Sequence, residues 1–70
     1  MNKLILSKKI YNENYIEQCI NEFSELSNIS IINNKDSCTL VFEDCIYDEN
    51  TTIKEFENYL IDYSFTKGLE

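Results

Sequence analysis

The chain begins with an alternation of side chains that is typical of a β-strand. In residues 3–10, Leu4, Leu6 and Ile10 fall on one side of a period of two, and Ser7 falls on the other. A strand with this pattern buries one face and leaves the other face in water. We therefore predict a half-buried strand over this segment.

The next segment has apolar residues at intervals of three and four, which is the spacing of one face of an α-helix. These residues are Ile16, Cys19, Ile20, Phe23 and Leu26. Asn12 precedes them, and its side-chain oxygen can cap a helix N-terminus. Ser27 and Asn28 follow them, and Asn tolerates the left-handed conformation in which many helices end. We predict a helix between Asn12 and Ser27.

A β-hairpin is predicted next. Residues 29–32 form a β-branched run, and residues 33–36 are rich in types that bond to their own backbone in turns. A second run, residues 37–43, again alternates between two sides. The apolar residues that share one side of this second run are Cys38, Leu40 and Phe42.

A polar loop and a second helix complete the pattern. Residues 44–50 are polar except for Ile46 and Tyr47, which we expect to be tucked under the loop. The run Thr52-Ile-Lys-Glu55 matches a capping box, so the helix should begin there and end at Gly68. Its inner apolar positions are Ile53, Phe56, Leu60 and Tyr63.

The order strand, helix, strand, strand, helix predicts an α+β fold of the form β-α-β-β-α. A right-handed crossover favours a truncated ferredoxin-like arrangement, with a three-stranded antiparallel sheet in the order 1-3-2 and two helices on one face. The first strand is then a free edge. Such an edge is either protected by charges, here Lys3, Lys8 and Lys9, or pairs with another strand.

Cysteine usage and the absence of long apolar runs indicate a cytoplasmic protein. The three cysteines form no C-x-x-C pair, and an odd number leaves at least one thiol free, which indicates a reducing compartment. The first residues lack the apolar run of a signal peptide or membrane span. We expect one domain over residues 1–68, no contact with membrane, and an expression-tag remnant at Leu69 and Glu70.

The charge balance argues against nucleic-acid binding. The chain has 13 acidic and 6 basic residues, a net charge of −7, and no arginine. A phosphate backbone would be repelled, and no guanidinium is present to read guanine edges or grip phosphate. We therefore expect a protein or peptide partner.

Most of the side chains that enzymes use are missing. Without histidine, no Ser or Cys nucleophile can be paired with a His base. The one glycine, Gly68, cannot form a phosphate-binding loop. Cys19 and Cys38 fall on apolar faces and should be core residues, while Cys45 lies beside Asp44, whose charge disfavours a thiolate. We expect no catalytic residue, cofactor or metal ion; a metal or redox protein built on the cysteines is a third alternative.

An acidic cluster lies between the hairpin and the second helix. Its members are Glu43, Asp44, Asp48 and Glu49. The spacing does not match the regular calcium loop, which also needs a glycine. A solvated charged loop and a face that binds a basic peptide both explain the cluster.

Two surfaces are candidates for partner binding. On the edge strand, the candidate contact residues are Leu4, Leu6 and Lys8. On the second helix, Ile61 and Phe65 lie four residues apart and can form one apolar patch. Tyr47 and Tyr59 also fall outside the inner stripes, so incidental exposure and a binding patch both remain open.

Several of these positions occur in a known family. They are the cap Tyr11-Asn12, the helix residues Ile16 and Phe23, and the closing run Phe56-Glu57-Asn58-Tyr59-Leu60-Ile61-Asp62. From about Leu6 to Tyr63, the chain resembles the HxsD-like family, small accessory proteins of His-Xaa-Ser peptide-modification systems. In this resemblance Asn58 is a polar match that packing does not require, so it joins the candidate contacts. The family usually has an Arg after the position of Asp62, which this chain lacks.

The resemblance implies a role beside radical-SAM maturation enzymes that act on a ribosomally made peptide, without catalysis by this chain. Our leading hypothesis is a non-catalytic binding or accessory protein. The alternative is an acidic homodimer, paired through its first strands, that serves as a structural or antitoxin-like protein and binds a basic partner.

Overall fold

The computed structural model describes residues 2–68, which form five regular elements. In chain order they are β1 (Lys3–Ser7), α1 (Glu13–Glu22), β2 (Asn28–Asn33), β3 (Ser37–Glu43) and α2 (Glu49–Gly68). The predicted order of elements is therefore confirmed. Leu69 and Glu70, the expected tag remnant, lie outside the described residues.

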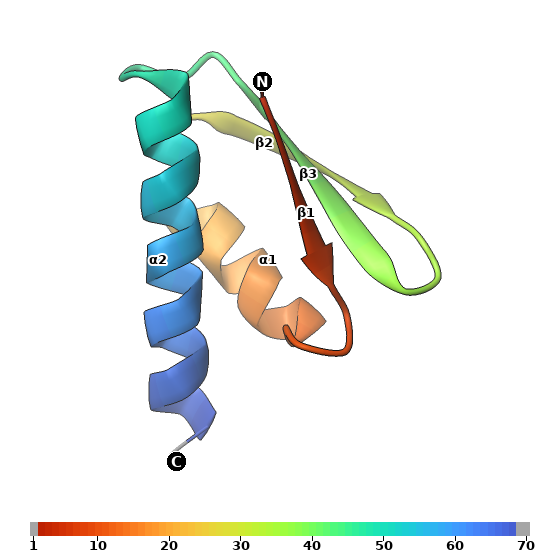
Figure 1. The fold of residues 1–70 in the computed structure, drawn as a ribbon. Coiled ribbons are helices and arrows are strands. Elements are labelled where there is room, and N and C mark those ends of the chain that lie inside the picture. Colours follow the sequence, from red (N-terminus) through yellow and green to blue (C-terminus); the bar gives the residue numbers. More distant parts are fainter. Residues whose placement is uncertain (1, 69–70) are drawn as a thin grey trace.

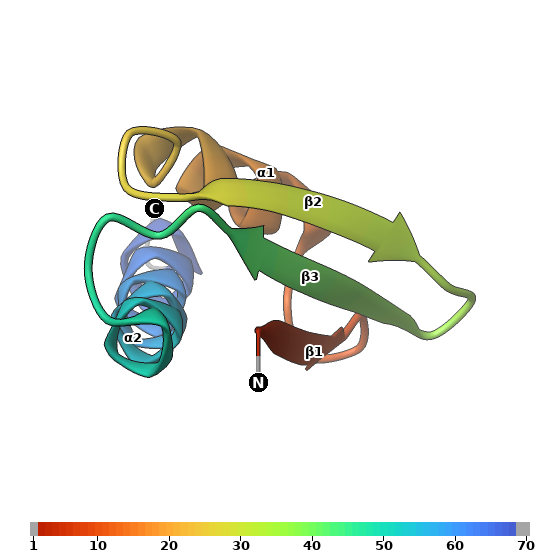
Figure 2. The same cartoon turned by 90° about the horizontal axis from the view of Figure 1, so that it is seen from above.

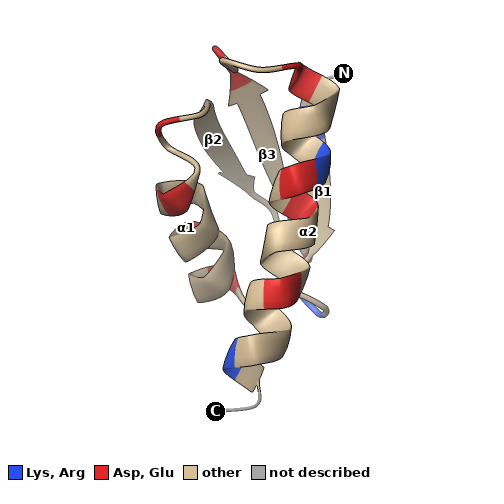
Figure 3. Ribbon diagram, turned by 90° about the vertical axis from the view of Figure 1, so that its left-hand side faces the viewer, with Lys and Arg blue, Asp and Glu red and all other residues tan. Residues whose placement is uncertain are grey.

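The strands form one antiparallel sheet in the order β1-β3-β2, so the third strand lies between the first two (Figure 2). Leu4 stands opposite Leu40, and Ile29 stands opposite Phe42. Both helices lie on one face of the sheet (Figure 1). Viewed from the helix side, α1 lies in front of β2 and α2 in front of β1 (Figure 3). The predicted α+β architecture is confirmed, and β1 is an edge strand.

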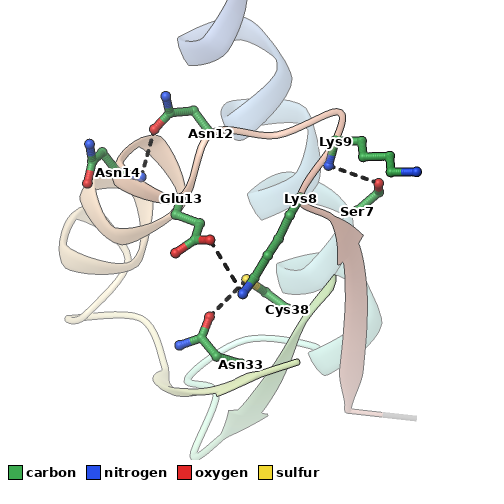
Figure 4. A network of polar contacts seen from close by, with 8 residues as sticks. All are labelled: Ser7, Lys8, Lys9, Asn12, Glu13, Asn14, Asn33 and Cys38. Atoms are coloured by element: carbon green, nitrogen blue, oxygen red, sulfur yellow. Dashed lines mark hydrogen bonds and ion pairs between the residues drawn. The ribbon is translucent and has the colours of Figure 1, made fainter. Parts of the chain in front are cut away.

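The strand β1 is shorter than the predicted strand over residues 3–10. The backbone N–H groups of Ile10 and Tyr11 donate to the carbonyl oxygen of Ser7 at 3.2 and 3.0 Å, which turns the chain away from the sheet. The Ser7 hydroxyl also accepts from the backbone N–H of Lys9 at 3.2 Å (Figure 4). Ile10 is consequently 74% exposed, and its predicted place on the buried face is wrong.

The first helix starts as predicted but ends early. The Asn12 side chain accepts a hydrogen bond of 2.8 Å from the backbone N–H of Asn14, so Asn12 is the N-cap (Figure 4). The predicted end at Ser27 is wrong. The N–H groups of Leu26 and Ser27 both donate to the carbonyl oxygen of Phe23, at 2.9 and 3.1 Å, in a tight turn that replaces the last helical turn.

The second helix begins before the predicted capping box. The Asp48 carboxylate accepts hydrogen bonds of 3.0 Å from both the backbone N–H and the hydroxyl of Thr51, so Asp48 acts as the cap. These bonds lower the pKa of Asp48 from its ordinary value. Thr52 is not the cap: it is 3% exposed, and its hydroxyl donates to the carbonyl oxygen of Asp48 at 2.9 Å.

Because α2 begins at Glu49, the loop between β3 and α2 is too short to fold back over the core. Ile46 and Tyr47 are 61% and 67% exposed, so the prediction that the loop covers them is wrong. Cys45 takes that place, half-buried against the core. The loop is held to the chain before β2 by the N–H of Ile46, which donates to the carbonyl oxygen of Leu26 at 3.0 Å.

The core lies between the sheet and the two helices. Its buried apolar residues are Leu6, Ile16, Cys19, Phe23, Cys38, Leu40, Phe42, Phe56 and Leu60. The Phe56 ring lies 5.2 Å from that of Phe23 and 5.4 Å from that of Phe42, both edge to face. Phe56 therefore joins α2 to α1 and to β3 through ring contacts that aromatic pairs favour.

Candidate functional site

Hydrogen bonds at both ends of β1 show which backbone groups face β3. The N–H of Phe42 donates to the carbonyl oxygen of Asn2 at 2.7 Å, and the N–H of Lys8 donates to that of Asp36 at 3.0 Å. Antiparallel strands direct the groups of every second residue to a given neighbour. The even-numbered residues of β1 therefore bond to β3, and the odd-numbered residues direct their N–H and C=O groups away from it.

The free edge of β1 consists of the backbone of Lys3, Ile5 and Ser7. The Ser7 carbonyl oxygen already accepts from the N–H groups of Ile10 and Tyr11. The groups left for a partner are the N–H and C=O of Lys3 and Ile5 and the N–H of Ser7. Such a row of outward groups is the template on which another strand can pair.

One flank of α2 lies beside this edge. Ile53, Glu57 and Ile61 are four residues apart and share the flank opposite Tyr59. The Tyr59 ring centroid lies 5.7 Å from that of Phe23, the C-cap of α1. The flank therefore faces away from α1, on the side of β1 (Figure 3). Ile53 and Glu57 are half-buried and Ile61 is 46% exposed. We call this flank, together with the free edge of β1, the β1 edge site.

The other edge of the sheet is less suited to an added strand. The strand β2 is also terminal in the sheet. Helical spacing places Glu17 and Asn21 on the flank of α1 that faces away from α2, opposite Tyr15 and Phe23, and both are exposed. A strand beside β2 would meet these polar side chains together with the half-buried Ile20, whereas one beside β1 would meet Ile53 and Ile61 together with Glu57.

The candidate residues on the edge strand have different surroundings. Leu4 is half-buried and packs against the core. Leu6 was a candidate contact residue, but it is 2% exposed. Its side chain points to the helices and its backbone bonds to β3, so it presents no free group to a partner. Lys8 follows the end of β1, and its Nζ lies 3.4 Å from Glu13 Oε1 (Figure 4).

The candidate residues on α2 lie together. Asn58, Ile61 and Phe65 are three and four residues apart and share the outer face of the helix, where all are exposed. Phe65 is 69% exposed. Of these three residues, only Ile61 also belongs to the β1 edge site. Whether the other two contact a partner stays a prediction.

A row of β-branched residues crosses the sheet face opposite the helices. Ile5 and Ile32 both stand opposite Thr39, one on each side of β3, and are 69% and 51% exposed. Sequence reasoning did not select Ile5, although the alternation that places Leu4 and Leu6 inside places Ile5 on the opposite face.

The acidic cluster has structural contacts. Asp48 caps α2, and the Asp44 carboxylate accepts from the side-chain amide of Asn28 at 2.9 Å. Asp44 has a φ of 53°, in the left-handed region that Asp tolerates better than most residues. Within residues 2–68, no three His, Cys, Asp or Glu side chains come together in a way that could hold a metal ion.

The two cysteines that fall on apolar faces, Cys19 and Cys38, are placed as the pattern predicts. Cys19 and Cys38 are 0% exposed in the core, and Cys45 is half-buried with its Sγ 3.2 Å from the Ser27 hydroxyl. Burial, and to a smaller extent the charge of Glu22, raises the pKa of Cys19 to about 11. A thiol with that pKa is protonated at neutral pH and is a poor nucleophile.

Alkaline pH is expected to weaken the fold through Cys19. Its ordinary pKa is 9.0 and its pKa in the folded chain is about 11, so folding favours the neutral thiol. This contribution is complete below pH 9 and is lost as the pH rises to about 11. Urea unfolding at about pH 8 and about pH 10.5 measures the loss. Cys19→Ala should lose less stability over that interval; an equal loss would contradict the assignment.

Comparisons with known proteins add no family to this description. No family model matches the chain, and searches of curated proteins and of solved structures found no match. Within the described residues, no helix combines the length and apolar character of a membrane span. The resemblance to the HxsD-like family stays a prediction, so the function is argued from the geometry.

Proposed function

We propose that this chain is a non-catalytic binding protein that receives an extended segment of a protein or peptide partner along β1. The observation that carries the proposal is the combination of outward backbone groups on Lys3, Ile5 and Ser7 with an isoleucine-bearing flank of α2 beside them. Strand addition supplies main-chain hydrogen bonds for affinity and places alternate side chains on opposite faces for specificity.

The two faces of the added strand would meet different surroundings. Side chains on the helix side would contact Leu4 and the flank with Ile53 and Ile61, so apolar residues suit these positions. Glu57 on the same flank favours a lysine or arginine nearby. Side chains on the open face would lie beside Ile5. The segment is thus apolar at alternate positions and carries basic residues, which also suits a chain with a net charge of −7.

The absence of histidine from the sequence and the burial of Cys19 and Cys38 support a role without catalysis. The resemblance to the HxsD-like family suggests the source of the segment. In that case it belongs to a ribosomally made peptide, or to the radical-SAM enzyme that modifies it, and this chain acts in the cytoplasm as an accessory protein.

A second copy of the chain is the alternative occupant. Antiparallel pairing of two β1 strands about Ile5 would place each Lys3 opposite the Ser7 of the other copy, so the lysines would not face each other. The same site then supports an acidic homodimer of the structural or antitoxin-like kind. Sedimentation at several concentrations distinguishes this from a monomer that binds a peptide.

A random-peptide library displayed on phage provides defined probes for the site. We expect the selected peptides to alternate apolar residues and to include basic ones. Hydrogen exchange of the ¹⁵N-labelled protein with a selected synthetic peptide should slow at the amides of Lys3, Ile5 and Ser7, because their N–H groups become bonded. Failure to enrich any peptide, or protection confined to the edge of β2, would refute the proposal.

A further inference from the structure

A hollow of about 300 Å³ lies on the flank of α2 that faces α1, opposite the β1 edge site. Its lining residues are Tyr59, Asp62, Tyr63, Thr66 and Lys67. Rings on the α1 side pack against the two tyrosines. The Tyr63 ring centroid lies 5.4 Å from that of Tyr15, and the Tyr59 ring centroid lies 5.7 Å from that of Phe23. The volume is at the lower limit for small-molecule pockets, which suits a single long side chain.

The chemistry of the hollow favours a cation. The Nζ of Lys67 lies 5.7 Å from the centroid of the Tyr63 ring, so one ring of the hollow already holds an ammonium group of the chain itself. Asp62 adds a carboxylate to the lining. Partial desolvation, followed by the negative charge of Glu22, raises the pKa of Tyr59. Glu22 and Asp62 therefore place negative charge near Tyr59, while the Lys67 ammonium lies over the neighbouring Tyr63 ring.

We propose that this hollow binds a lysine or arginine side chain of a partner protein, with the cation over the Tyr59 ring and paired with Asp62. The charge of −7 on the chain attracts such a partner, and the exposed ring gives the cation a specific place. This inference does not depend on strand addition at β1, because the two sites lie on opposite flanks of α2.

The probe is a capped pentapeptide, Ala-Ala-Lys-Ala-Ala, compared with its arginine and norleucine counterparts. Titration of ¹⁵N-labelled protein should shift the amides of residues 59–67 with the lysine and arginine peptides, and not with the neutral one. Tyr59→Leu, which removes the ring and keeps apolar volume, and Asp62→Asn should each weaken binding about two- to fivefold, the range of an exposed cation–ring or ion-pair contact.

Matched variants separate a local site from attraction by net charge. Asp36→Asn, on the β2–β3 turn, makes the same charge change as Asp62→Asn and should leave binding unchanged. Lys67→Gln should strengthen binding because it removes the competing ammonium, whereas Lys35→Gln, with the same charge change at the turn, should not. Equal effects within either pair, or no response to Tyr59→Leu, would overturn the proposal. So would a dimer that Asp62→Asn dissociates, because a second copy would then be the occupant.

Discussion

The Ile5→Pro variant is expected to bind the selected peptides at least about tenfold more weakly than the unchanged protein, a loss of about 1.4 kcal/mol. The N–H of Ile5 lies at the centre of the free edge, and proline removes that donor and places its ring where the partner strand would pair. The ladder to β3 survives, because edge strands tolerate proline where the lost N–H faced outward. Isothermal titration calorimetry with a selected peptide measures the change.

Two control variants show which group carries this effect. Ile5→Thr keeps the N–H and the β-branched shape but removes the apolar surface, so its effect should be small. Ile31→Pro removes an outward N–H from the edge of β2 and should not weaken binding beyond its effect on folding. If Ile5→Thr weakens binding as much as Ile5→Pro, the peptide contacts the side chain and not the strand edge.

Phe56→Ala is expected to lower the free energy of unfolding by about 3–5 kcal/mol. The Phe56 side chain is 0% exposed and contacts Phe23, the C-cap of α1, and Phe42 of β3, so its removal leaves a cavity where three elements meet. At roughly 0.05–0.15 kcal/mol per residue, a chain of this length has only about 4–10 kcal/mol to lose. Urea unfolding followed by circular dichroism should show a variant that is largely unfolded or close to it.

Phe65→Ala is the matched control for this prediction. It removes the same side chain from the same helix at a position that is 69% exposed, where surface changes are usually within about 0.5 kcal/mol. Similar losses for the two variants would show that Phe56 does not hold the core together.

The fold followed from features that are local in the sequence. Burial followed from two spacings. One is the alternation of Cys38, Leu40 and Phe42, and the other is the helical spacing of Phe56 and Leu60. All five residues are in the core. Strand order then followed from the handedness of the crossover. Element ends were less predictable, because turns, caps and helices compete over small energy differences.

The candidate site could be predicted only in part. The sequence indicated the free strand and the candidate residues Leu4 and Leu6, but the available backbone groups belong to their neighbours. Which residues face outward depends on the register between β1 and β3, and the turn after Ser7 helps to fix it. The hollow at Tyr59 and Tyr63 depends on where contacts with Phe23 and Tyr15 hold the two rings, which the spacing of apolar residues does not reveal.

The exposed row of β-branched residues with Ile5 and Ile32, and the free edge of β1, also affect the solubility of the protein. Repulsion between copies, each with a charge of −7, opposes their stacking through these surfaces. That repulsion extends about 8 Å at physiological ionic strength and about 3 Å in 1 M salt. Concentrated salt, or acid that neutralises the carboxylates, therefore favours precipitation, and dilute buffer near neutral pH opposes it.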